Sequence, residues 1–593
     1  MSNKLRDLNP VNAPERSEPL EPKVAVQTKP NKAPSRMVTT LCLLTLGAAL
    51  LVVLYSHRMV AGLVDSDAMD FAQLGRNLLA GHGLATHILR PLALTDTTNP
   101  LAQPDLTHGP LYPFLLALVF GIAGAKDVVV TGVSALFYVL TVPALYFLGR
   151  RLFSPKVGLL ASLIFLTNST ILYYASSGTS TTLLLFLATC LFLTLYQAAI
   201  QARKSAEDPN AKIKKAPFLL AGLLSGLLYL TEPFLVWMLP VLLVAVAFLP
   251  PTRYPARRAA AAGLFALPLA LLVLPCMFRF GLLTGNPFFG LRGAELWMDT
   301  KTYPGFLAYR LSSSDVVGGI DSLKGIAGKV FLRATNGVTL LQNLPASCVL
   351  LFVLPGLFFG FADPALGRLR SLVLGCLVSV FVGTLFLTFN PALLLIAFPG
   401  LLVFALHYLM HLSQEARLPR GWAIMASVLF GFALLSPLAA SIVATSKPAA
   451  VSQIAVAKSL EQKSHPDEVV FSDKPWIVAW YADRPSVWIP ARAYQMAAMR
   501  KPNAKARWLF LTEDTRREAP EWSMVFDNLM QWNRQFQYAR TSGTPLPESL
   551  PIARSQAPIT EALEGFAPLP PVEKEMPTAV VAAVSAAGAV AQK

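Results

Sequence analysis

Apolar stretches long enough to cross a membrane recur along most of this chain, and they constrain its fold more than any other feature. A transmembrane helix needs about 20 apolar residues. The chain is 54% hydrophobic and only 14% charged, whereas soluble proteins are about 25% charged. About eleven segments qualify as spans: 38–60, 128–149, 157–175, 181–200, 216–231, 233–250, 259–278, 346–362, 371–389, 392–410 and 421–442. The sequence therefore predicts a polytopic α-helical membrane protein.

Basic residues gather in short loops on one side of this array, which the positive-inside rule assigns to the cytoplasm. They are Lys29, Lys32, Arg36, Arg150, Arg151, Lys156, Arg203, Lys204, Lys212, Lys214, Lys215, Arg253, Arg257, Arg258, Arg368, Arg370, Arg417 and Arg420. The net charge of +16 therefore reflects topology, and we expect no nucleic-acid partner. The expected location is the cell inner (plasma) membrane, with a cytoplasmic N-terminus and an extracytoplasmic C-terminal domain.

Composition divides the chain into four regions. They are a disordered cytoplasmic arm (1–36), a transmembrane module (37–445) with long outer loops (61–127 and 279–345), a soluble α/β domain (446–540) and a disordered Pro/Ala-rich tail (541–593). The α/β prediction rests on short strands at 468–472, 486–490 and 507–511 and on helices at 454–463 and 524–536.

An acid cluster follows the first span. Asp65, Asp67 and Asp70 lie within six residues, and ionised carboxylates beside hydrocarbon need a local reason. The spacing predicts a helix from Asp67 to a C-terminal cap at Gly81, with its dipole stabilising negative charge at the start. One interpretation is that an acid here only caps the helix. The other is that Asp67 is a working acid/base, with Asp65 as its substitute.

A second polar group precedes an apolar segment, 110–124, which is too short to span and is expected to be interfacial or re-entrant. His108 could contact a phosphate as a cation or donor, or be an ordinary interfacial histidine. Arg90 and Arg279 are further phosphate candidates, although Arg279 could simply snorkel to the interface. Glu232 lies at a break between spans, where structural pairing is favoured over catalysis.

These residues resemble the first outer loop of the GT-C glycosyltransferases, in the branch of protein O-mannosyltransferases and the lipid A aminoarabinose transferase. The resemblance rests on the acid cluster running through Asn77, on His108-Gly109-Pro110-Leu111-Tyr112-Pro113, and on Tyr146-Phe147-Leu148-Gly149-Arg150-Arg151-Leu152-Phe153. It covers about 60–250, and beyond that only hydropathy is alike.

The resemblance implies inverting transfer of a sugar from a polyprenyl-phosphate donor outside the cytoplasmic membrane. By carry-over, Asp67 is the general base and His108 contacts the donor phosphate, with Arg90, Arg279, Asp70 and Tyr112 as the remaining substrate-binding candidates. The implied partners are the lipid-linked donor, membrane lipid, and an acceptor that is a protein, lipid or glycan. No cofactor is expected; the acids leave a divalent metal open. No cysteine spacing indicates zinc or a disulfide framework.

Two positions depart from the family pattern. Gly178-Thr179-Ser180-Thr181-Thr182 lacks a second acid that many relatives carry, and Ala392 stands where relatives often have an arginine. Two other classes of function stay open, a transporter or flippase for a lipid-linked glycan and a non-catalytic scaffold. A transporter predicts polar residues deep in several spans, whereas here they gather in the outer loops.

Overall fold

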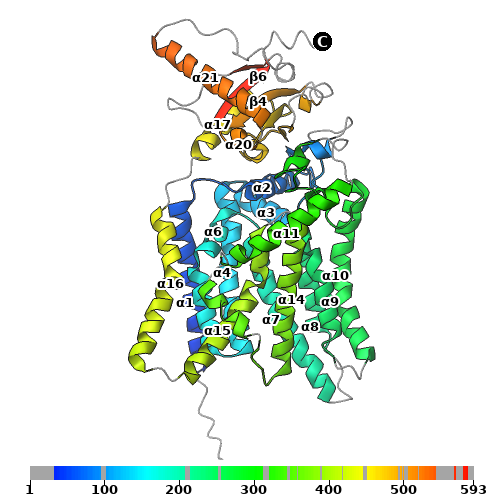
Figure 1. Ribbon diagram of the computed structural model, residues 1–593, viewed down its shortest axis with the longest axis vertical. Coiled ribbons are helices and arrows are strands. Elements are labelled where there is room, and N and C mark those ends of the chain that lie inside the picture. The colour runs from blue at the N-terminus through cyan, green and yellow to red at the C-terminus, as the bar shows by residue number, and fades with distance from the viewer. Residues whose placement is uncertain are drawn as a thin grey trace, which may run out of the picture. The chain divides into compact units, whose positions relative to one another are not determined.

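The computed structural model describes residues 33–94, 102–207, 214–250, 255–311, 320–342, 347–356, 358–387, 390–416, 419–444, 450–491, 495–496, 499, 505–518, 520–542, 566–568 and 579–584. Most of the predicted N-terminal arm lies outside these ranges. The chain divides into two units, Met1–Leu43 and Leu44–Lys593. The described part of the first unit is the beginning of helix α1, and the fold below belongs to the second (Figure 1).

Helices make up most of the described chain. They are α1 (Ala33–Met59), α2 (Ser66–Leu79), α3 (Leu111–Ala123), α4 (Asp127–Leu152), α5 (Pro155–Thr167), α6 (Ser169–Ser177), α7 (Thr181–Glu207), α8 (Ala216–Thr231), α9 (Leu239–Ala247), α10 (Pro255–Thr284), α11 (Ile320–Gln342), α12 (Ser347–Leu350), α13 (Val353–Gly356), α14 (Pro364–Phe386), α15 (Phe398–Glu415), α16 (Arg420–Ala444), α17 (Ala450–Lys463), α18 (Pro475–Ile477), α20 (Thr515–Glu518) and α21 (Pro520–Ser542). Short 3₁₀ segments are η1 (Pro91–Ala93), η2 (Pro233–Met238), η3 (Gly290–Leu296), η4 (Leu307–Arg310) and η6 (Pro391–Ala397), and η7 (Val478–Ala482) is a π-helical turn.

Six helices in the described part of the chain are long and apolar enough to cross a membrane, or seven if the bent pair α5–α6 counts as one span. The polytopic helical prediction is therefore confirmed, but the count of about eleven is not. Several expected spans are shorter apolar helices, such as α8 and α9. The span expected at 346–362 is wrong as one helix, because its described residues form the four-residue helices α12 and α13.

Local sequence explains where the helices break. Asn168 caps α6 by accepting a hydrogen bond from the backbone N–H of Ile171, and α5 and α6 meet there at 61°. Pro233 cannot continue α8, and the Glu232 carboxylate accepts from the N–H of Phe234 to start η2. The chain thus passes from α8 to η2 and α9 at Glu232, and α8 and α9 are two separate helices, as the two predicted spans 216–231 and 233–250 required.

Glycines allow the closest helix contacts. A Cβ added at Gly222 of α8 would lie 2.0 Å from the carbonyl oxygen of Phe265 on α10. A Cβ at Gly149 of α4 would lie 2.6 Å from the Cα of Gly158 on α5. These backbones approach too closely for any side chain, so the sequence of small residues sets the packing distance.

One sheet of six strands has the order β1-β3-β2-β4-β6-β5. Its strands are β1 (Ile88–Leu89), β2 (Val469–Ser472), β3 (Ser486–Trp488), β4 (Ala506–Thr512), β5 (Phe566–Pro568) and β6 (Ala579–Val584). The first four strands in this order pair in parallel, whereas β6 pairs antiparallel with both β4 and β5. The three strands expected from the sequence are present, and both predicted helices lie within α17 and α21 (Figure 1).

Two features of this sheet differ from the sequence-based expectation. β1 comes from the first outer loop and pairs with β3 nearly 400 residues later, Ile88 opposite Ser486. Phe566–Pro568 and Ala579–Val584 are strands, so the prediction of a disordered tail over 541–593 is wrong for these segments. The β6 segment is rich in alanine and has no alternation of apolar and polar residues, so no strand was predicted there. Pairing with β4 determines its structure.

The core beside the sheet joins distant parts of the chain. Trp522 and Phe526 of α21 are buried with Phe471 of β2, and Met298 and Tyr309 from the second outer loop lie in the same cluster. Both outer loops are therefore anchored to the C-terminal sheet.

Candidate functional site

The site begins at the N-terminus of α2, where Asp65 and Asp67 have different roles. Asp65 is the N-cap and its Oδ1 accepts a 2.9 Å hydrogen bond from the N–H of Asp67. Ala80 is the C-cap, where the sequence predicted Gly81, and Gly81, with φ of 84°, comes next and allows the chain to turn. The helical prediction is thus confirmed within a residue, and the capping role falls to Asp65.

The carboxylate of Asp67 takes part in no such cap. Its side chain is exposed, and within the described residues it has no hydrogen-bond or ion-pair partner. Burial, together with the neighbouring charge of Asp67, raises the pKa of Asp65 to about 6. Tyr174 of α6 lies close enough to both carboxylates to feel their charge.

One helical turn beyond Asp67, the structure brings together three of the predicted site residues. Asp70 is buried, and its Oδ2 lies 3.1 Å from Nη2 of Arg90 and 3.7 Å from Nδ1 of His108. Gln73, one turn further, donates a hydrogen bond of 2.9 Å to Asp70 Oδ1. The ring of Phe71 meets His108 edge-on at 4.9 Å between centroids.

Asp105 completes this charge cluster, which we define as Asp70, Arg90, Asp105 and His108. Thr107 donates from Oγ1 to Asp105 at 2.8 Å and lies 2.9 Å from Nδ1 of His108. Asp105 was not singled out from the sequence, because an acid in a loop carries no pattern. Its proximity to His108, three residues on, was the available signal.

In the charge cluster, neighbouring opposite charges shift the pKa values of His108 and Asp105. Burial opposes a charged imidazole, but Asp70 and Asp105 outweigh it and raise the pKa of His108 to about 9. Burial would likewise raise the pKa of Asp105, but His108 and Arg90 hold it below its usual range. His108 is therefore an imidazolium at neutral pH. Its Nδ1 faces these partners, and no described residue bonds its Nε2.

A second ionic group lies in the loop after α10. Arg292 pairs with Glu295 at 2.8 Å and with Glu232 at the α8 break, so Glu232 has the structural partner that the sequence favoured. Tyr309 donates to Glu295 at 2.9 Å, and the guanidinium of Arg90 lies 5.7 Å from the Tyr309 ring centroid. No sequence motif had indicated Arg292 or Glu295.

The remaining predicted residues occupy different surroundings. Arg279, near the C-terminal end of α10, is half-buried beside Phe280 and has no ion-pair partner in the described chain. Tyr112 is fully buried, and its hydroxyl donates to the carbonyl of Gly178 at 3.0 Å and contacts Ser134. Tyr112 therefore ties α3 to α4 and to Gly178, in the loop before α7. Ala392 is buried in η6.

The C-terminal part of the chain reaches the same helix. Arg76 of α2 pairs with Asp483 at 2.6 Å and donates to the carbonyl oxygens of Ala479 and Trp480. No three His, Cys, Asp or Glu side chains in the described ranges are grouped so that they could hold a metal ion.

Comparisons with known proteins fit this arrangement. Residues 107–278, less than a third of the chain, match the dolichyl-phosphate-mannose-protein mannosyltransferase family. The archaeal oligosaccharyltransferase AglB from Archaeoglobus fulgidus, solved with an inhibitory peptide and a dolichol-phosphate, superposes with a TM-score of 0.53 at 12% identity, over 83% of this chain and 72% of AglB. ArnT from Cupriavidus metallidurans, bound to undecaprenyl phosphate, gives 0.50 at 14% identity, over 93% of this chain and 99% of ArnT.

The chain has the GT-C glycosyltransferase fold. The resemblance stated from the sequence is thereby confirmed, and with its apolar helices the chain is a multi-pass membrane protein of this fold. At these identities the likeness is one of fold. A comparison with curated protein sequences finds no match.

Proposed function

We propose that this GT-C chain is a glycosyltransferase that moves a sugar from a polyprenyl-phosphate donor to an acceptor hydroxyl at the extracytoplasmic membrane face. The fold supports this proposal, and so do the lipid phosphates named for AglB and ArnT. In that fold the acid cluster of α2 and the apolar helix α3 pack side by side (Figure 1). The acceptor is a protein, a lipid or a glycan.

The observation that carries the proposal is the carboxylate of Asp67, which has no hydrogen-bond or ion-pair partner among the described residues. It lies one turn from a buried cluster containing two cations. In the proposed single displacement, Asp67 accepts the proton of the acceptor hydroxyl as its oxygen attacks the anomeric carbon. The bond from that carbon to the phosphate oxygen breaks, and its electron pair leaves on the polyprenyl phosphate. Attack opposite the leaving group inverts the anomeric configuration.

The phosphate end of the donor needs positive charge that is not already paired. Arg279 meets this requirement within the described residues, and the charged His108 keeps Nε2–H available as a donor. Arg90 and Asp70 hold His108 in position through their pairing. Asp65, as the N-cap, fixes the first turn of α2 and so the direction of the Asp67 side chain.

The test is sugar transfer by purified protein from a panel of labelled polyprenyl-phosphate sugars. Asp67→Asn should lower turnover about 10²–10⁴-fold, the usual contribution of one general base, without changing the melting temperature. Asp467→Asn, at a partly exposed carboxylate of the C-terminal part that pairs with His465 and Lys505, is the control and should retain activity. Equal turnover by Asp67→Asn and wild type would remove Asp67 from the chemistry, and no transfer by wild type from any donor would favour a scaffold.

A further inference from the structure

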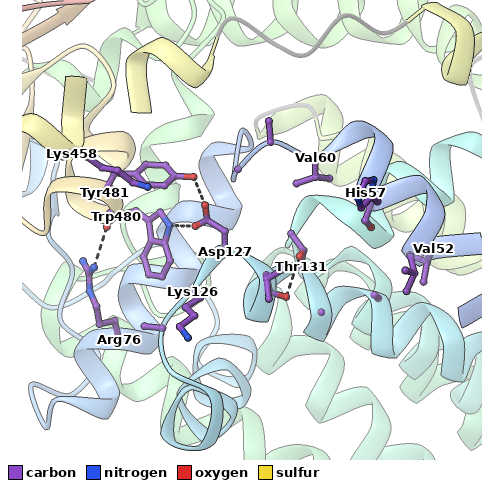
Figure 2. Close-up of a pocket in the computed structure, with 18 of the residues that line it drawn as sticks. Val52, His57, Val60, Arg76, Lys126, Asp127, Thr131, Lys458, Trp480 and Tyr481 are labelled. Atoms are coloured by element: carbon purple, nitrogen blue, oxygen red, sulfur yellow. Dashed lines mark hydrogen bonds between the residues drawn. The ribbon is translucent and has the colours of Figure 1, made fainter. Parts of the chain in front are cut away.

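A cavity of about 1060 Å³ lies away from the charge cluster, along the other end of α2 (Figure 2). Its walls come from the end of α1, the start of α4, and the C-terminal segments α17 and η7. Arg76 is the residue of α2 that reaches it, nine positions after Asp67, which is roughly 13 Å along a helix. The volume is at the upper end of the range for a site that holds a small ligand.

The half of this cavity between α1 and α4 is apolar and open. Val53 of α1 and Val128 of α4 are 63% and 76% exposed. Gly132, one turn after Val128, has nothing within 4 Å of the place where a Cβ would lie. The neighbouring outward-facing residues of α1 are Leu46, Leu50 and Leu54, each more than half exposed. A groove of this kind between two apolar helices suits a hydrocarbon chain.

The other half is charged, and two of its three acids have hydrogen-bond or ion-pair partners. Asp127 accepts hydrogen bonds from Nε1 of Trp480 at 2.7 Å and from the hydroxyl of Tyr481 at 3.0 Å (Figure 2). Asp483 pairs with Arg76, whereas the exposed carboxylate of Glu461 acts on Arg76 only through its charge.

Fewer of the basic side chains that line the cavity have partners. The side chains of Lys126 and His57 have no hydrogen-bond or ion-pair partner within the described residues. Lys458 has a ring contact, its Nζ lying 5.7 Å from the Tyr481 ring centroid, and no carboxylate partner in the same ranges. Two unpaired lysines against one unpaired carboxylate, that of Glu461, leave an excess of unpaired positive charge at the cavity, which complements a phosphate.

We propose that this cavity binds an anionic lipid, with its phosphate against Lys126 and Lys458 and its hydrocarbon chain along Val53, Val128 and Gly132. His57, in the last turn of α1, adds a third basic group at the same rim. Because Trp480 and Tyr481 line the same cavity as the start of α4, the bound lipid contacts both the membrane helices and the C-terminal part of the chain. This site is separate from the proposed donor contacts at His108 and Arg279.

The binding assay needs no enzymatic turnover, so its result is independent of the proposed function. The full chain is purified in detergent and incubated with phosphatidylglycerol, with a polyprenyl phosphate, or with uncharged diacylglycerol, and retained lipid is counted by native mass spectrometry. We expect wild type to retain at least one phosphate-bearing lipid and not diacylglycerol. The first two arms distinguish a membrane phospholipid from an isoprenoid phosphate.

The variants test the two halves of the cavity separately. Lys126→Glu/Lys458→Glu should lower retention of the anionic lipid at least five-fold, whereas Lys463→Glu, at an exposed lysine of the same helix α17, should leave it unchanged. Gly132→Leu keeps every charge, fills the open groove and favours the helix, so it should also lower retention while the protein still folds. Unchanged retention in either the charge variant or Gly132→Leu, or equal retention of diacylglycerol by wild type, would overturn the proposal.

Discussion

The charge on His108 has a direct consequence for stability against pH. In the folded chain its side chain is 12% exposed, lies beside Asp70 and Asp105, and has a pKa raised from 6.5 to about 9. A group with a raised folded pKa contributes stability that is fully present below its unfolded pKa and is lost as pH rises through the folded one. The contribution of His108 is therefore whole below about pH 6.5 and absent well above pH 9.

The size of this effect follows from the two pKa values. At 1.36 kcal/mol for each unit of difference, the range from 6.5 to about 9 corresponds to about 3 kcal/mol. The lowered pKa of Asp105 does not interfere, because its carboxylate stays ionised throughout this range and loses its contribution only in acid. Loss of the imidazolium leaves Asp70 and Asp105 with Arg90 as their nearby cation in the cluster.

The experiment compares wild type with His108→Gln. Each protein, in dodecyl maltoside micelles, is unfolded with increasing SDS at several pH values from 6 to 10, and tryptophan fluorescence reports the free energy of unfolding. Wild type should exceed the variant at pH 6 and lose about 3 kcal/mol of that advantage by pH 10. Groups that titrate in both proteins cancel in the difference.

His465→Gln is the matched control, because the His465 side chain is 82% exposed and should give a flat difference from wild type. A His108→Gln difference that does not vary with pH would refute the reasoning. A difference that disappears by pH 7 would do the same, since it would assign His108 an ordinary pKa.

Two further predictions concern a buried ion pair and the close packing of two helices. Asp70→Asn removes the partner of a buried guanidinium, so it should destabilise the chain by about 3–5 kcal/mol in the same SDS titration; a loss under 1 kcal/mol would show that Arg90 is solvated instead. Gly222→Ala should lower the melting temperature strongly because its Cβ would meet the Phe265 carbonyl oxygen at 2.0 Å, whereas Gly132→Ala, in open space, should stabilise by up to about 1 kcal/mol. Similar melting temperatures for these two alanine variants would contradict the close packing of α8 and α10.

Local patterns account for the parts of the fold that the sequence predicted well. The helix after Asp65 has an N-cap, a periodic apolar face and a glycine at its end, and each of these signals lies within a few residues of the structure it specifies. The strands at 469–472, 486–488 and 506–512 have β-branched and aromatic residues in short runs. The number of spans was less predictable: the break after α8 was placed correctly at Glu232, but hydropathy did not show that 346–362 contains the short helices α12 and α13.

The candidate site likewise has a part that the sequence predicted and a part that it did not. Its acid-rich segment and His108 were visible as unusual residues beside apolar ones. The division of roles between Asp65 and Asp67 was not, because either residue could have taken the capping position. Asp105, Arg292 and Glu295 also escaped notice, since each acquires its importance only from partners far away in the chain, such as Glu232 for Arg292.

Sequence alone thus determined that this is a multi-pass helical protein of GT-C type with a cluster of acids after its first span, because hydrophobic burial and helix capping act over a few turns of chain. Tertiary structure alone decided the charge cluster around Asp70, the addition of β1 and β6 to the sheet, and the cavity bounded by Arg76 and Trp480. Arg76 and Trp480 are 404 residues apart. Contacts of that range depend on how whole elements pack, and no periodicity within either segment encodes them.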